Sequence, residues 1–114
     1  MKTKAKQTKK AQTLAPEPGT YCIFRCTGAG VHAGILVSRN HDEARIRDSR
    51  RLWHWWSRFT LSALALEGPR ADKIGECQFA AAIPHEIDLI GVCEVIPCTP
   101  VAEAGVRAVP EHNR

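Results

Sequence analysis

The pattern of apolar and polar positions predicts β-strands in the first half of the chain. Residues 21–26 are rich in β-forming side chains and end in the turn-forming sequence Thr27-Gly28-Ala29-Gly30. Residues 31–39 follow at hairpin distance, and a polar cluster at residues 38–42 indicates a second turn. Residues 44–48 then alternate apolar and charged side chains, which is the period of a half-exposed strand. We therefore expect a three-stranded antiparallel meander.

All three tryptophans of the chain lie in the segment 49–59, at positions 53, 55 and 56. As a strand, this segment places Trp53 and Trp55 on one face together with Arg51, and Trp56 on the opposite face. In a domain of this size three tryptophans supply much of the core, so we expect at least one or two to be buried, but three so close in sequence cannot all point inward. We expect at least one exposed tryptophan beside arginines, which marks a binding or oligomer interface.

The second half of the chain predicts one helix and two further strands. Thr60 can cap a helix over residues 61–67, and Gly68-Pro69 ends it. Residues 70–76 are expected to form a loop. The remaining apolar runs predict strands at residues 77–83, interrupted by Pro84, and at residues 87–96, weakened or bulged at Gly91.

These elements indicate the fold class and the domain organisation. A chain of 114 residues has room for one hydrophobic core. We predict an α+β domain with a small curled antiparallel β-sheet, or a partly open barrel, of about five strands with one short helix. This single β-rich domain is expected at residues 19–98. Residues 1–18 read as a flexible basic arm, and residues 99–114 as a C-terminal tail.

The positive charge of the chain is concentrated at its N-terminus. The formal net charge is +4, but five of the sixteen basic residues lie within the first ten positions. The rest of the chain carries eleven basic and twelve acidic residues, so the folded part is not basic. The arm lacks the apolar stretch of a secretory signal, and no run approaches the roughly 18 apolar residues of a membrane span. We expect a cytoplasmic protein.

The five cysteines do not indicate a disulfide framework or a zinc site. An odd number of cysteines in a chain without an export signal predicts reduced thiols. No C-x-x-C pair occurs, and Cys22 and Cys26 lie about 13 Å apart along a strand, too far to share one metal ion. Cys22, Cys77 and Cys93 are expected to be small core residues. No metal or cofactor is predicted.

Several short blocks of sequence carry a resemblance to a known family. They are Gly30-Val31-His32-Ala33-Gly34, Leu36-Val37-Ser38-Arg39, Arg50-Arg51-Leu52-Trp53-His54-Trp55, Thr60-Leu61-Ser62-Ala63-Leu64-Ala65 and Glu94-Val95-Ile96-Pro97-Cys98. Because these blocks occur in this order, the chain resembles a family of small uncharacterised proteins found in phages and prophages, over about residues 20–98. The resemblance implies a phage accessory gene product, and it supplies no catalytic residues.

Two sets of residues are candidates for ligand contact. The first is His32, Arg51, Trp53 and Trp55. His32 lies in a glycine-rich segment whose backbone N–H groups could approach a phosphate, although the same segment also fits a glycine-softened hairpin with a surface histidine. The second set could contact nucleic acid, because arginine pairs with phosphate and indole rings stack on bases. It comprises Arg45, Arg47, Arg50 and Trp56. The alternative is that these arginines form a solvated strand face.

The sequence does not favour an enzyme. The motifs G-x-S-x-G and H-E-x-x-H are absent, and the pair His85-Glu86 follows a proline in a polar loop. The first hypothesis is a non-enzymatic phage accessory protein that inhibits or sequesters a host component, either a defence protein or a nucleotide-like signal. The second is a nucleic-acid-binding module that uses the lysine arm, and the third is a minor structural or assembly protein of the particle. A homo-oligomer is expected, because small sheets often hide their edges by self-pairing.

Overall fold

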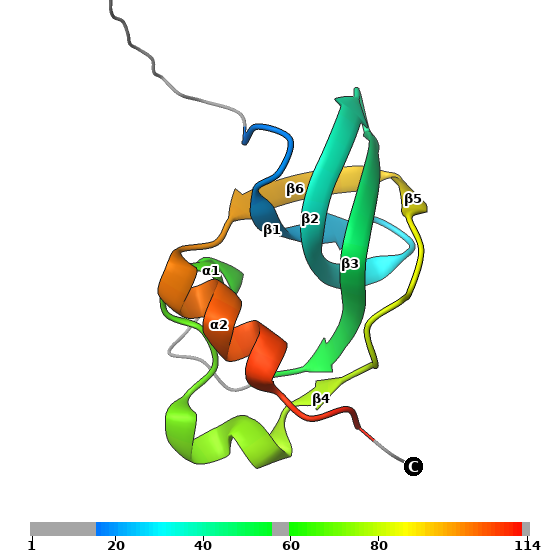
Figure 1. The fold of residues 1–114 in the computed structure, drawn as a ribbon. Helices are drawn as coiled ribbons and strands as arrows, with labels where there is room; N and C mark the ends of the chain where they lie inside the picture. Colours follow the sequence, from blue (N-terminus) through cyan, green and yellow to red (C-terminus); the bar gives the residue numbers. More distant parts are fainter. Residues whose placement is uncertain (1–15, 56–59, 113–114) are drawn as a thin grey trace, which may run out of the picture.

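The computed structural model of the chain describes residues 16–55 and 60–112 (Figure 1). Within these residues, six strands and two α-helices follow one another, and one 3-10 helix lies between the two α-helices. The strands are β1 (Tyr21–Cys26), β2 (Gly30–Asn40), β3 (Glu43–His54), β4 (Gln78–Phe79), β5 (Ile87–Ile90) and β6 (Val92–Pro97). The helices are α1 (Leu61–Glu67), η1 (Ala71–Glu76) and α2 (Pro100–Ala108).

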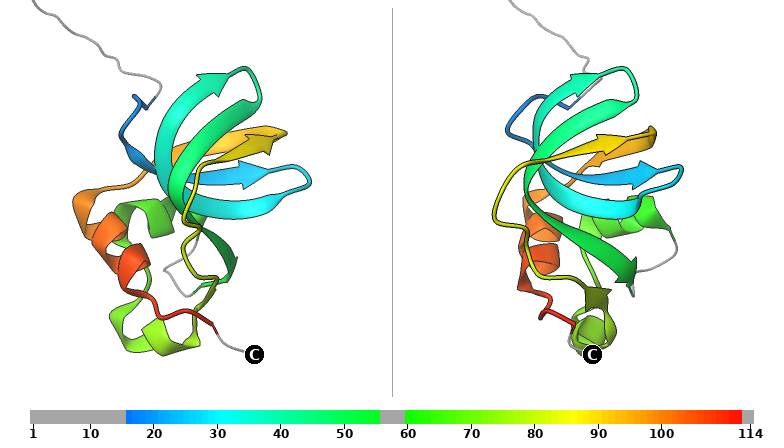
Figure 2. Two further views of the ribbon diagram at one scale, coloured as in Figure 1. Left: turned by 45° about the vertical axis from the view of Figure 1, so that its right-hand side comes forward. Right: turned by 90° about the vertical axis from the view of Figure 1, so that its right-hand side faces the viewer.

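The strands form one antiparallel sheet in the order β4-β3-β2-β1-β6. The long strand β3 pairs with β2 on one side, and on its other side with β5 near its start and with β4 near its end. Gly91, with a φ of 79°, separates β5 from β6 and carries the chain from the β3 side of the sheet to the β1 side. The sheet curls strongly without closing (Figure 2). The prediction of an α+β fold with a curled antiparallel sheet is confirmed.

Both faces of the curled sheet are buried. The inner cluster lies within the curl and contains Cys22, Phe24, Cys26, Leu36, Ala44, Ile46, Leu89 and Val92. The helix-side cluster packs the other face against α1 and α2 and includes Tyr21, Ile23, Ala33, Leu52, Leu64, Phe79 and Val106. Successive residues of β1 therefore alternate between two hydrophobic clusters. This is why the first four residues of β1 form a continuous apolar run, which the exposed Arg25 interrupts.

A β-bulge in β3 changes which face its side chains occupy. Arg47 pairs with Ile35 and Arg50 with Ala33, so Asp48 and Ser49 both stand opposite Gly34. Asp48 has a φ of 50°, a left-handed conformation that a bulge can require. Before the bulge, the even-numbered Ile46 belongs to the inner cluster, whereas after it the even-numbered Leu52 belongs to the helix-side cluster.

Helix α1 begins and ends as predicted. The hydroxyl oxygen of Thr60 accepts a hydrogen bond from the backbone N–H of Ala63 at 3.2 Å, and Gly68 follows the helix with a φ of 79°. Residues 70–76, expected to form a loop, instead contain η1. The strand expected at residues 77–83 is limited to β4, because the alanines that follow Phe79 have low strand propensity. Backbone bonds from Ala80 to Arg51 and from Ile83 to Ser49 still hold this segment beside β3.

The expected C-terminal tail contains a second helix, so this prediction was wrong. Thr99 caps α2 by accepting a hydrogen bond from the N–H of Ala102 at 3.1 Å, and Pro100 occupies the first helical turn. Ala102, Val106 and Val109 are buried at a helical spacing. No helix within the described residues is long and apolar enough to cross a membrane.

The cysteines are only partly where the sequence placed them. Cys22 and Cys77 are buried, as predicted for small core residues, but Cys93 is exposed. The ladder between β1 and β6 shifts register beside Cys93, because Arg25 pairs with Glu94 while Cys26 pairs with Val92. The extra residue at this bulge is therefore Cys93, and its thiol donates to the carbonyl of Arg25 at 3.3 Å instead of entering the core.

Candidate binding surface at the end of strand β3

Trp53 is a large aromatic side chain that the fold leaves in water. It is 54% exposed near the end of β3, so the prediction of an exposed tryptophan is confirmed. Leu52 pairs with Phe79 and His54 with Gln78, which leaves Trp53 as the extra residue of a second bulge. Bulges re-aim side chains, and this one explains why a large aromatic residue points away from the packed clusters.

The C-terminal segment brings a second ring to Trp53. The backbone N–H of His112 donates to the carbonyl of Phe79 at 2.9 Å, which holds the segment along β4. The imidazole of His112 then meets the indole of Trp53 edge to face, with ring centroids 6.1 Å apart and an interplanar angle of 76°. Sequence reasoning missed His112, because it assigned the whole C-terminal segment to a tail.

Arg51 lies two positions before Trp53, about 7 Å away along the strand. Its side chain is exposed and makes no hydrogen bond or ion pair with any residue that the structure describes. Most other exposed arginines are paired with carboxylates; the pairs are Arg25–Glu94, Arg45–Asp88, Arg47–Asp48, Arg70–Asp72 and Arg107–Glu103. The guanidinium of Arg51 is therefore available to an external group. We call Arg51, Trp53 and His112 the Trp53 surface.

His32 lies beneath this surface and not on it. It pairs with Arg51 across the β2–β3 ladder but is only 1% exposed, so it is a buried histidine and not a surface one. Its Nε2 lies 2.9 Å from the carbonyl oxygen of Ala29 in the turn between β1 and β2. Burial lowers the pKa of His32. The hydrogen bond with Ala29 opposes this shift and the positive charge of Arg51 adds to it, so the pKa lies below its usual value and the neutral ring is favoured.

The other two predicted tryptophans do not add to the exposed surface that the structure describes. Trp55 is half-buried and packs against the helix-side cluster, where it supports the end of β3. Trp56, predicted as a possible nucleic-acid contact, lies outside the described residues. Four residues were predicted for ligand contact. The structure brings Arg51 and Trp53 to the surface, whereas His32 is buried and Trp55 is half-buried.

Arg50 has a structural role in place of the predicted nucleic-acid contact. Its side chain is 7% exposed, and its Nε donates to the carbonyl of Ala80 at 2.8 Å. Its Nη1 donates to the carbonyls of Val106 and Val109 at 3.2 and 2.7 Å, at the end of α2. The guanidinium also lies 5.3 Å from the centre of the Phe79 ring. Arg50 thus joins α2 to the sheet, and its donors are not available to a ligand.

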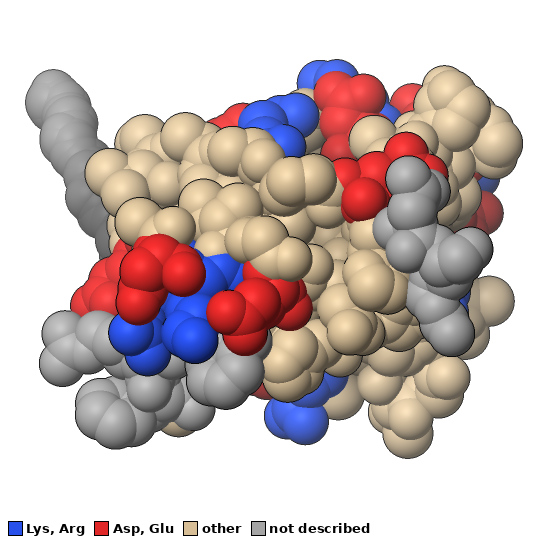
Figure 3. All heavy atoms as spheres, turned by 90° about the horizontal axis from the view of Figure 1, so that it is seen from below, with Lys and Arg blue, Asp and Glu red and all other residues tan. Residues whose placement is uncertain are grey.

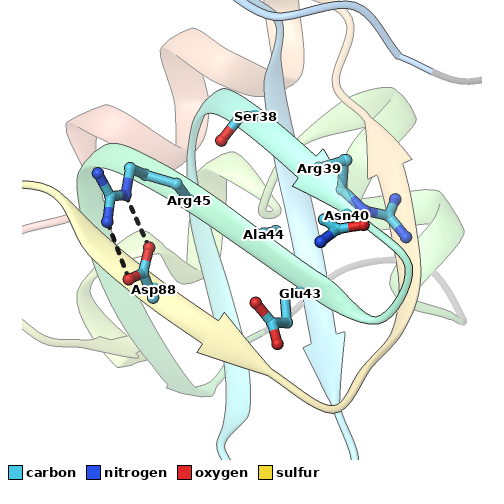
Figure 4. Close-up of a pocket in the computed structure, with 7 residues that line it drawn as sticks. All are labelled: Ser38, Arg39, Asn40, Glu43, Ala44, Arg45 and Asp88. Atoms are coloured by element: carbon cyan, nitrogen blue, oxygen red, sulfur yellow. Dashed lines mark hydrogen bonds and ion pairs between the residues drawn. The ribbon is translucent and has the colours of Figure 1, made fainter.

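Arg45 and Arg47 are exposed but paired. Arg45 donates two hydrogen bonds to Asp88, at 2.8 and 3.0 Å, and this bidentate contact lowers the pKa of the Asp88 carboxyl (Figure 4). Arg47 lies 3.5 Å from a carboxylate oxygen of its neighbour Asp48. A nucleic acid would have to displace these carboxylates before it could use either arginine.

A polar recess of about 200 Å³ lies at the hairpin between β2 and β3. Its walls come from three neighbouring strands, with the Arg45–Asp88 pair on one side and Arg39 and Asn40 on the other (Figure 4). The complete lining consists of Ser38, Arg39, Asn40, Glu43, Ala44, Arg45 and Asp88. Because Glu43 and Trp53 are ten residues apart on β3, the recess lies about 30 Å along the strand from the Trp53 surface.

The charge distribution does not form a large basic surface on the face shown in Figure 3. There, basic side chains lie beside acidic ones, and a broad uncharged area separates the charged groups.

Among the described residues, no three His, Cys, Asp or Glu side chains are grouped so that they could hold a metal ion. His85 and Glu86, the acid–base-looking pair in the sequence, are both exposed.

These features define a small α+β domain whose open, curled sheet ends in an exposed aromatic and cationic surface. The chain belongs to the family called domain of unknown function DUF6948, whose family model matches residues 19–106. The match extends through most of α2, which agrees with the packing of this helix on the domain. No curated protein and no solved structure matches the chain.

Proposed function

We propose that this protein is a non-enzymatic phage or prophage accessory protein that acts in the cytoplasm of the host cell by binding a host protein. The Trp53 surface is its contact, and binding inhibits or sequesters the partner. The observation that carries the proposal is an exposed tryptophan close to an arginine whose guanidinium has no partner among the described residues. Tryptophan and arginine are enriched among the residues that contribute most of the energy at protein interfaces.

The position of the recess favours a protein partner over a nucleotide-like ligand. Small-molecule sites are concave and surround most of their ligand. The recess lies at the opposite end of β3 from Trp53 and is lined by exposed ion-paired or polar groups. A nucleotide stacked on the open face of Trp53 would leave much of its surface in water. A protein surface, in contrast, can enclose Trp53 and Arg51 from outside.

Binding of nucleic acid is the second candidate, because an indole ring near an arginine can stack on a base. Its electrostatic support would come from the five lysines of the first ten residues. The rest of the chain has eleven basic and twelve acidic residues, and five of its exposed arginines already pair with carboxylates. The folded domain therefore adds little attraction for phosphate, which is why we rank this function second.

The test compares Trp53→Ala and Arg51→Ala with the control Val101→Ala. Val101 is 69% exposed on α2, so the control removes a similarly exposed apolar side chain elsewhere. Each protein is purified gently from bacterial cells and examined by native mass spectrometry and by the ratio of absorbance at 260 and 280 nm. A co-purifying protein of defined mass is then produced separately, and its affinity for each variant is measured.

We expect one defined host protein, bound with simple stoichiometry. Its affinity should fall at least tenfold, or about 1.4 kcal/mol, in Trp53→Ala and Arg51→Ala and stay unchanged in Val101→Ala. Salt-sensitive nucleic acid, or a small nucleotide adduct, that is lost in the same two variants would replace the proposal with the corresponding ligand. Equal binding by all variants would remove the Trp53 surface from the function, and association only with phage particles would favour an assembly protein.

A further inference from the structure

Two buried polar atoms of the sheet have no hydrogen-bond partner among the residues that the structure describes. They are Nδ1 of His32 on β2 and Oγ of Ser49 on β3, and both atoms are buried among described residues. His32 is 1% exposed and Ser49 is fully buried. An unsatisfied buried polar atom costs about 1–3 kcal/mol, so two of them in one small core require an explanation.

The hydrogen-bonding states of the two atoms are complementary. The carbonyl oxygen of Ala29, 2.9 Å from Nε2 of His32, can only accept, so Nε2 carries the ring proton and donates. In the neutral ring, Nδ1 is then an acceptor that has no donor. Ser49 carries a hydroxyl proton that has no acceptor. One group that both donates and accepts would satisfy both atoms.

The two side chains lie on the same face of the sheet, on the neighbouring strands β2 and β3. Ser49 packs directly over Gly34, where an added Cβ would lie only 2.8 Å from the Cβ of Ser49. His32 is two residues before Gly34 on β2, so it points to the same face about 7 Å along the strand. A water molecule with two hydrogen bonds of about 2.8 Å each spans most of this distance, and the two side chains span the rest.

We infer that an internal water molecule binds between Nδ1 of His32 and Oγ of Ser49. It donates to the imidazole and accepts from the hydroxyl. Globular proteins hold about one buried water per 27 residues, usually at polar groups that lack another partner. A chain of this length is therefore expected to hold a few.

The water site has a structural consequence for β3. Ser49 is one of the two residues of the first bulge, and the bulge sets the face that each later side chain of β3 occupies. Tying Ser49 to His32 on β2 fixes the bulge, and Arg51 follows two residues later. The same pair is not a serine–histidine nucleophile, because both side chains are sealed from any substrate. The inference does not depend on the proposed function.

The first test uses the sign of a stability change. If water links the two residues, Ser49→Ala removes one of its hydrogen bonds, and the melting temperature should fall by about 4 °C or more. If the hydroxyl has no partner at all, the same substitution removes an unsatisfied group and leaves the melting temperature unchanged or raises it. Ser38→Ala is the control, because Ser38 is an exposed serine on a neighbouring part of β2.

The second test observes the water directly. A high-resolution crystal structure of the full chain should show density within hydrogen-bonding distance of both atoms. In solution, magnetisation transfer from water to the His32 ring should be seen in the unchanged protein and lost or weakened in Ser49→Ala. A direct contact between Oγ and Nδ1, or an interior without water and without a stability change in Ser49→Ala, would overturn the inference.

Discussion

At the scale of single residues, Arg50 is a buried cation without a carboxylate partner among the described residues. Burial lowers the pKa of its guanidinium, and three carbonyl groups around it provide the compensation, two of them from the end of α2. Because a helix C-terminus carries partial negative charge, a cation placed there is favourable. Arg50 therefore stabilises the fold through carbonyl groups that are distant in sequence.

Replacing Arg50 by methionine should lower the stability by roughly 2–3 kcal/mol, because it leaves buried carbonyl groups without donors. Chemical denaturation measures this change. Arg70→Met is the matched control, since Arg70 is exposed and pairs only with Asp72, and it should change the stability by less than about 0.5 kcal/mol. A more stable Arg50→Met protein would mean that the cost of burying the guanidinium exceeds the value of its hydrogen bonds.

The residues of the candidate surface were predictable only in part. Three tryptophans within four positions required one to be exposed, and Trp53 is. The burial of His32 was not predictable, because its glycine-rich surroundings suit an open turn as well as the interior of a curled sheet. His112 contacts Trp53 from 59 residues further along the chain, and no local pattern reports such a contact.

At the scale of elements, the bulge of β3 depends on a glycine in the neighbouring strand. An added Cβ at Gly34 would lie 2.8 Å from the Cβ of Ser49 and 3.0 Å from the carbonyl oxygen of Arg47. The second of these atoms belongs to the backbone and cannot move aside cheaply. The absence of a side chain at this position therefore allows β2 and the bulge to pack together.

Gly34→Ala should destabilise the protein by about 1–3 kcal/mol, the usual cost of adding a group to a filled core. Thermal unfolding followed by circular dichroism measures this loss. Gly28→Ala is the control, because no atom lies within 4 Å of its added Cβ, and its effect should stay within about 0.5 kcal/mol. Equal melting temperatures for the two variants would show that the bulge adapts to a side chain.

The elements that were predicted have local signals, and those that were missed do not. The meander of β1, β2 and β3 follows from alternation and turn residues, and α1 from its cap and stop. The strand predicted at residues 77–83 is reduced to β4, the part that pairs with Leu52 and His54 of β3. Helix α2 was not predicted, because a proline can either end a helix or occupy its first turn, as Pro100 does here.

At the scale of the whole molecule, the free edge of the sheet bears on self-association. Strand β6 ends the sheet order and has no neighbour on its outer side among the described residues. Pro97 lacks a backbone N–H, and the bulge at Cys93 interrupts the ladder with β1. Both features make this edge strand a poor template for pairing with another chain. The predicted homo-oligomer stays a prediction, and this edge does not favour it.

The whole domain depends on its last helix, and truncation tests this directly. Val106 and Val109 are buried in or beside α2, Val106 packs in the helix-side cluster, and Arg50 bonds to the carbonyls of both. A chain that ends at Cys98, the limit of the domain expected from sequence, would expose that cluster and leave Arg50 without two of its acceptors.

We therefore expect the chain that ends at Cys98 to unfold or to lose most of its cooperative thermal transition, whereas a chain that ends at His112 should melt like the full chain. Calorimetry of the three proteins measures the difference. If the shorter chain kept the full transition, α2 would be an appendage and the domain would end where the sequence alone placed it. Loss of the transition would instead show that the C-terminal segment, which also supplies His112 to the Trp53 surface, is part of the folding unit.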